Sequence, residues 1–283
     1  MTPTATGKSH LSCTCCTMFV KGLSRSVSHP VWRREVVQGR VDRVNPVAEL
    51  RSFLRASLVT PVPRSQRDPL HVLHRRRVVS AITLVLGSVV LWWSLQLRPG
   101  DPLFYAGTAL LAGIWLGGAF LAGPLYLGRA HTRDGEGYAR PVVQSLALGA
   151  LLLGVFLAGA FLVAQVPFLR GPVDDLLDHA RFGSLPLVLV ITMVNGIAEE
   201  LFFRGALYAA IPQRWTVAAT TVIYAMTTVV VGVPLLVLAA VSLGLVCGLQ
   251  RRVTGGVLGP VITHITWSSG MLLLLPPLLS TLR

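Results

Sequence analysis

The stretch MVNGIAEELFFRGALYAAIP, residues 193–212, lies in a long hydrophobic run and yet holds Glu199, Glu200 and Arg204. A bilayer core of about 30 Å needs about 20 consecutive apolar residues per helix, so the run predicts a membrane span. Each ionisable residue near the centre of such a helix costs about 2.5 to 3.5 kcal/mol on insertion scales. Three of them within six positions therefore require compensating contacts.

The whole chain is more hydrophobic than a water-soluble domain of its size. Of its 283 residues, 53% are hydrophobic and 13% are charged, and its mean hydropathy is +0.64. By the same length requirement, seven runs predict membrane spans: 78–96, 103–127, 142–169, 184–211, 215–231, 234–250 and 257–279. The fifth and sixth runs are short and are joined by GVP, so they form either a tight hairpin or one irregular element. The sequence thus predicts an all-α, polytopic bundle of about seven transmembrane helices within residues 78–283.

Residues 1–77 are expected to form a basic, mostly unstructured tail. They hold 14 lysine and arginine residues against four acidic residues, with no long apolar stretch. One segment, 47–59, has apolar residues at helical spacing with Arg51 and Arg55 between them. This pattern predicts a short amphipathic helix on the membrane surface. The tail lacks zinc-finger spacing, a helix-turn-helix pattern and an aromatic platform, so anionic lipid, and not nucleic acid, is its expected partner.

Positive residues are distributed unevenly between the ends of the spans. Those expected on one side are Arg75, Arg76, Arg77, Arg129, Arg133, Arg140, Arg214, Arg251 and Arg252. The opposite loops hold Arg98, Arg170 and Arg181, and three aspartates offset the last two. Because arginine and lysine are retained on the cytoplasmic side, the N-terminus is predicted to be cytoplasmic and the C-terminus to lie outside.

The three charges of the fourth span divide into a pair and a single carboxylate. Glu200 and Arg204 are four residues apart with the acidic residue first, the better orientation for an ion pair on a helix. Glu199 is rotated from Glu200 by about 100° and is left without a charged neighbour. It could mark the point where the helix leaves the membrane, but the span continues for about twelve residues, or about 18 Å, beyond it. Glu199 is therefore a candidate general base for activating water.

One histidine lies inside a predicted span. His264, in GGVLGPVITHITWSSGML, is about eight residues, or about 12 Å, from the start of the seventh span near Gly256. A single histidine in a bundle is usually a hydrogen-bonded residue of the core. Its depth from the cytoplasmic side nevertheless approaches that of Glu199, so we expect the two side chains to share a cavity open to the cytosol.

These residues resemble the motifs of the CAAX-protease and bacteriocin-processing family of intramembrane endopeptidases, over a core of about residues 184–279. The first family motif, E-E-x-x-x-R, is complete at Glu199, Glu200 and Arg204. The last, H-x-x-x-N or H-x-x-x-D, matches in part, with His264 present and Ser268 in place of the amide or acid. In the middle motif, F-x-x-x-H, Tyr224 and Thr228 stand at the two positions.

The resemblance implies hydrolysis of peptide bonds in membrane-associated or lipid-modified peptides, in the plasma membrane of a bacterium. Glu199 would activate the water, Glu200 and Arg204 would hold the helix, and His264 would orient the water or bind a metal. Catalytic zinc normally has three protein ligands, and Glu199 with His264 supplies two, so the cofactor is left open. In a metal-free mechanism, the hydroxyls of Thr228 or Ser268 would stabilise the tetrahedral intermediate.

Two other functions fit the same sequence. Because Thr228 replaces the middle histidine, the chain could be a catalytically impaired relative that binds a membrane partner as a scaffold. Paired charges in spans also occur in small transporters, although no inverted repeat is visible here. The three hypotheses share membrane lipid as a partner.

Overall fold

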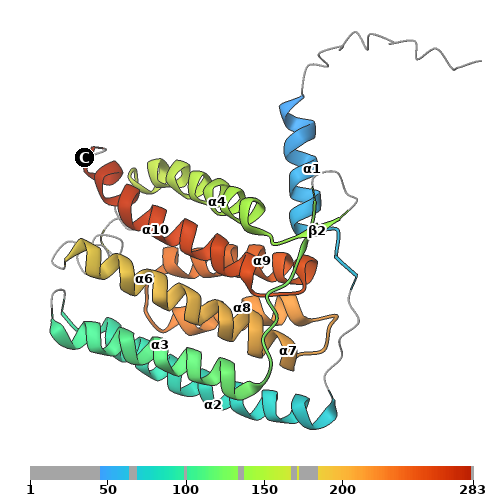
Figure 1. The fold of residues 1–283 in the computed structure, drawn as a ribbon. Helices are drawn as coiled ribbons and strands as arrows, with labels where there is room; N and C mark the ends of the chain where they lie inside the picture. Colours follow the sequence, from blue (N-terminus) through green and yellow to red (C-terminus); the bar gives the residue numbers. More distant parts are fainter. Residues whose placement is uncertain are drawn as a thin grey trace, which may run out of the picture. The chain divides into compact units, whose positions relative to one another are not determined.

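The computed structural model describes residues 45–63, 69–98, 101–132, 137–166, 171 and 184–281, and the basic tail up to residue 44 lies outside them. Most of the described residues are helical, and the only two strands among them are two residues long (Figure 1). The elements are α1 (Pro46–Leu58), α2 (Leu70–Leu95), α3 (Pro102–Ala122), β1 (Ala130–His131), β2 (Tyr138–Ala139), α4 (Val142–Val163), α6 (Leu185–Glu200), the π-helix η1 (Leu201–Leu207), α7 (Tyr208–Ala210), α8 (Thr216–Val229), α9 (Pro234–Thr254) and α10 (Leu258–Thr281).

The predicted all-α, polytopic membrane bundle is confirmed. Among the residues that the structure describes, six helices are long and apolar enough to cross a bilayer: α2, α3, α4, the continuous α6–η1–α7 segment, α9 and α10. The seventh apolar helix, α8, has 14 residues and is shorter than a full span. It forms a hairpin with α9 through Gly232, whose φ of 78° permits the reversal, so the GVP junction separates two helices.

The centre of the bundle is built around the segment that holds the glutamates. Trp115 of α3 stacks on Phe202 and packs against Phe203, with ring centroids 4.8 and 5.1 Å apart. All three rings are fully buried, together with Leu243 of α9. Figure 1 shows α6 between α3 and α10, and its contacts with both helices place the motif in the interior.

The first membrane helix begins at Leu70, eight residues before the expected start at Val78. The extra turns carry the arginine triplet, and these side chains donate to backbone carbonyls at the ends of other helices. The pairs are Arg75 Nε with Ala122 O at 3.4 Å, an Arg76 amino group with Pro124 O at 2.9 Å, and Arg77 Nε with Ala210 O at 3.2 Å. Helix C-termini leave carbonyls without intrahelical partners, and arginine satisfies them and favours that end of the dipole. The triplet therefore ties α2 to α3 and α7, besides its predicted influence on orientation.

The start of α10 is fixed by a close backbone approach. A Cβ atom on Gly256 would lie 2.0 Å from the carbonyl carbon of Leu127, so glycine is required there. The approach lets Val257 N donate to Tyr126 O at 2.8 Å and Leu258 N donate to Leu127 O at 3.1 Å. These bonds satisfy the first free N–H groups of α10 and fix the helix on which His264 lies.

Candidate active site

The E-E-x-x-x-R motif spans a change in helix type. Glu199 and Glu200 are the last residues of α6, and Arg204 lies in the π-helix η1. π-Helical turns are rare and occur frequently at functional sites. Gly205 lets this turn pack tightly, because a Cβ there would lie 2.6 Å from Cδ2 of Leu125. The motif is therefore held in an irregular turn that is packed against the segment following α3.

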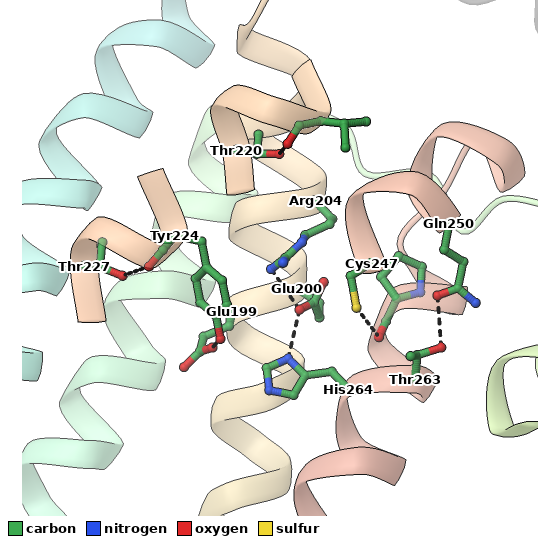
Figure 2. A network of polar contacts seen from close by, with 12 residues as sticks. Glu199, Glu200, Arg204, Thr220, Tyr224, Thr227, Cys247, Gln250, Thr263 and His264 are labelled. Atoms are coloured by element: carbon green, nitrogen blue, oxygen red, sulfur yellow. Dashed lines mark hydrogen bonds and ion pairs between the residues drawn. The ribbon is translucent and has the colours of Figure 1, made fainter. Parts of the chain in front are cut away.

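Glu200 lies at the centre of a buried polar cluster (Figure 2). Its Oε1 atom accepts hydrogen bonds from Arg204 NH1 at 2.9 Å and from His264 Nδ1 at 2.8 Å. Because an ionised carboxylate can only accept, we assign the proton of the contact with His264 to Nδ1. Within the described part of the chain, Oε2 of Glu200 and the Nε and NH2 atoms of Arg204 have no hydrogen-bond partner. The guanidinium also lies over the ring of Tyr224, 4.7 Å from its centroid.

Glu199 has a different environment, although it is the next residue. Its side chain is partly accessible, whereas Glu200 is fully buried. Its Oε2 atom accepts a hydrogen bond of 2.6 Å from the hydroxyl of Tyr224 on α8, and Figure 2 shows it turned toward that helix. No hydrogen bond to its Oε1 atom is formed by any described residue. Glu199 thus presents one uncommitted oxygen, held in position through the other.

The structure brings the predicted residues together, in one pair that the sequence specified and in two that it did not. The predicted ion pair of Glu200 with Arg204 is present. His264 was expected to work with Glu199, but its ring bonds to Glu200 instead. The other ring nitrogen, Nε2, has no hydrogen-bond partner among the residues described and lies beside Gly196, whose added Cβ would be 3.6 Å away. Tyr224 takes the place at Glu199 that His264 was expected to occupy.

The two hydroxyls expected to stabilise an oxyanion differ in their bonding. Thr228, where the family motif has histidine, donates to Ala225 O of its own helix at 2.7 Å. The Oγ atom of Ser268 is buried and finds no partner in the described residues. Only Ser268 therefore has a hydroxyl proton that is free to be donated elsewhere.

The side chains near Glu199 do not suit a catalytic zinc site. Such a site normally takes three ligands from His, Cys, Asp or Glu. In the described ranges no three residues of these types lie close enough to hold a metal ion. Nδ1 of His264 faces Glu200, and Thr228 and Tyr224 stand at the middle-motif positions. The donor set here is thus a pair of carboxylates, one imidazole and several hydroxyls.

Two further polar contacts were missed from the sequence. The first is the hydroxyl of Tyr224, for which the signal was a tyrosine in an apolar span, where its O–H needs a partner. The second is a buried network in which Gln250 Nε2 donates to Ser145 Oγ at 2.9 Å and Thr263 Oγ1 donates to Gln250 Oε1 at 2.9 Å. This network joins α4, α9 and α10 one residue before His264. Its signal in the sequence was a glutamine at the end of the apolar run 234–250, because a polar side chain in a span needs a hydrogen-bond partner.

The membrane bundle and its buried glutamate–arginine–histidine cluster place the chain in a class of proteins, the intramembrane protease-like membrane proteins. Residues 181–270 match the family model described as Type II CAAX prenyl endopeptidase Rce1-like. The match covers all the motif residues and confirms the predicted resemblance to the CAAX proteases. Neither the search of curated proteins nor the search of solved structures gave a match.

Proposed function

We propose that the protein is a glutamate-dependent intramembrane endopeptidase that cleaves membrane-associated or lipid-modified peptides. The observation that supports this proposal is the difference in burial and hydrogen bonding between the two adjacent carboxylates. Glu200 is buried and bonded to Arg204 and His264, whereas Glu199 is partly accessible and keeps Oε1 without a hydrogen bond from any described residue. A general base needs an uncommitted lone pair within reach of the water that it deprotonates. The family description adds the lipid-modified class of substrate.

In the proposed mechanism, Oε1 of Glu199 accepts a proton from a water molecule while the oxygen of that water attacks the scissile carbonyl carbon. The carbonyl π bond breaks and gives a tetrahedral intermediate. Glu199 then returns the proton to the leaving amine as the C–N bond breaks. His264, with its proton fixed on Nδ1 by Glu200, would present Nε2 as an acceptor that orients the water. The Ser268 hydroxyl would donate to the oxyanion.

A second candidate function is a catalytically impaired relative that binds a membrane partner. The observation that favours it is the bonding at Thr228, whose hydroxyl donates to Ala225 O within α8. Loss of one oxyanion donor typically lowers a rate by about 10²- to 10³-fold. A chain without the middle histidine could thus retain the fold and lose measurable turnover.

Cleavage of fluorogenic peptides, with and without an isoprenyl group on a cysteine near the C-terminus, tests the proposal. The purified full chain would be compared with Glu199→Gln, His264→Asn and a control, Glu49→Gln, which changes an exposed glutamate on α1. We expect cleavage by the wild type and the control, loss of cleavage in Glu199→Gln, and a reduced rate in His264→Asn. Cleavage that persists in Glu199→Gln refutes the mechanism. A folded wild type that cleaves no peptide supports the binding function instead.

A further inference from the structure

A shallow, open groove lies between α1 and the C-terminal turns of α9, and none of the glutamate-cluster residues lines it. Its volume is about 570 Å³, and its walls are Arg51, Leu54, Arg55, Leu58, Val59, Leu249 and Arg252. The segment after α1 is anchored to α9, because Val62 N donates to Val253 O at 2.9 Å. The groove thus belongs to the packed part of the chain, between the amphipathic helix and the end of a span-length helix.

The charged wall of the groove has one sign. Arg51 and Arg55 are one helical turn apart on α1, and Arg252 approaches from α9. All three side chains are exposed, and within the described ranges no carboxylate pairs with them. Glu49, the acidic residue of α1, is not part of the lining. Guanidinium groups bind phosphate oxygens in a bidentate manner, so three of them in one groove favour a phosphate group.

The remaining lining is entirely apolar: Leu54, Leu58, Val59 and Leu249. A site built for a free phosphate would not need four aliphatic side chains beside the arginines. The end of a membrane-spanning helix lies at the depth of the lipid headgroups, where basic side chains meet phosphates and aliphatic side chains meet acyl chains. The lining therefore matches a molecule with an anionic head and a hydrocarbon stem.

We propose that this groove is a binding site for one anionic phospholipid, whose phosphate contacts Arg51, Arg55 and Arg252 and whose acyl chain lies on the leucines. The site is distinct from general attraction of the basic tail to a charged surface, because it requires arginines from two helices. Occupation would fix α1 against α9.

Native mass spectrometry of the purified full chain, with equimolar phosphatidylglycerol and phosphatidylcholine, tests this proposal. The groove variant is Arg51→Gln, Arg55→Gln, Arg252→Gln, and the control variant, with the same loss of charge, is Arg98→Gln, Arg129→Gln, Arg214→Gln. Each basic residue near an anionic membrane surface contributes roughly a fivefold gain in binding. We therefore expect the groove variant to lose at least about tenfold in phosphatidylglycerol affinity and the control variant to retain the wild-type preference. Thermal midpoints measured in parallel identify any variant that fails to fold, in which case single Arg51→Gln and Arg252→Gln variants replace it.

Three results would overturn the proposal. Equal losses in the groove and control variants would show a general charge effect. No loss in the groove variant would show that the lipid binds elsewhere. Displacement of phosphatidylglycerol by soluble glycerol phosphate at the same concentration would show a phosphate site that does not use the acyl chain.

Discussion

Replacement of Glu200 by glutamine should destabilise the fold, whereas the same replacement at Glu199 should not. Oε1 of Glu200 accepts from both Arg204 and His264, and all three side chains are buried. Glutamine keeps the volume but removes the charge, which leaves the Arg204 guanidinium buried without a counter-ion. The comparison therefore measures the ion pair with little change in packing.

The expected loss in the free energy of unfolding follows from the burial of the Glu200–Arg204 ion pair. Breaking a buried ion pair by removing one partner typically costs about 3 to 5 kcal/mol. Glu199 is partly accessible and accepts one hydrogen bond, and the oxygen of a glutamine amide can still accept it from Tyr224. We expect Glu199→Gln to change the free energy of unfolding by less than about 1 kcal/mol. At about 2 to 4 °C per kcal/mol, Glu200→Gln should lower the thermal midpoint by roughly 6 to 20 °C.

The protein supplies its own reporter for this measurement. Cys247 is fully buried in the core, so its thiol reacts with a fluorogenic maleimide only when the bundle opens. Replacement of Cys13, Cys15 and Cys16 by serine leaves Cys247 as the single thiol of the chain. Heating the two glutamine variants and the parent in the same detergent then gives three comparable midpoints.

Two results would refute the reasoning. If Glu200→Gln melts with the parent, the Glu200–Arg204 contact does not support the fold. If Glu199→Gln loses as much stability as Glu200→Gln, Glu199 is a structural residue, and its assignment as the general base loses its basis.

Other parts of the structure give three further predictions. Tyr224→Phe removes the hydroxyl that donates to Glu199 and should lower stability by about 1 kcal/mol in the same thermal assay, the usual contribution of a single hydrogen bond. Gly256→Ala places a Cβ 2.0 Å from the Leu127 backbone and should cost about 3 kcal/mol. Its control, Gly154→Ala, meets no atom within 4 Å and should be neutral; equal midpoints for the two would contradict the close approach. Peptide cleavage should remain within about twofold of its rate after treatment with 1,10-phenanthroline, because the donor set is short of the three ligands of catalytic zinc; a chelator-sensitive rate would contradict this.

The bundle could be predicted because the bilayer imposes a simple rule on sequence. Runs of apolar residues gave each span-length helix among the described residues, together with a seventh run whose helix, α8, is shorter than a span. The ends of the helices were harder to predict. α2 extends to Leu70 because its arginines find carbonyls on other helices, and α3 stops at Ala122, before Gly123 and Pro124, instead of reaching residue 127. The start of α2 thus depends on which chain segment lies nearby, which hydropathy does not describe, whereas the end of α3 follows from Gly123 and Pro124, which stop a helix locally.

Contacts within the candidate site could be predicted from the sequence only where both residues lie on the same helix. Glu200 and Arg204 are neighbours on a single turn, so their spacing gave the ion pair. The partners that come from other helices, His264 and Tyr224, depend on how α10 and α8 are rotated against α6. A one-residue difference in that rotation exchanges Glu199 for Glu200 as the contact of the imidazole. Depth in the membrane, the quantity that sequence does supply, cannot distinguish adjacent carboxylates.

Glu199 and Glu200 have different partners because the motif lies between two neighbouring helices, α8 and α10. Adjacent residues on a helix point about 100° apart, so one carboxylate can face α8 while the next faces α10. The π-helical turn that follows interrupts the regular i→i−4 ladder, and Arg251 of α9 donates to Arg204 O at 2.8 Å within that turn. The turn is thereby held from α9, while Phe202 and Phe203 pack on Trp115 of α3. Since α3, α8, α9 and α10 each hold a different part of this one segment, the accessible oxygen of Glu199 is positioned by the packing of the whole bundle.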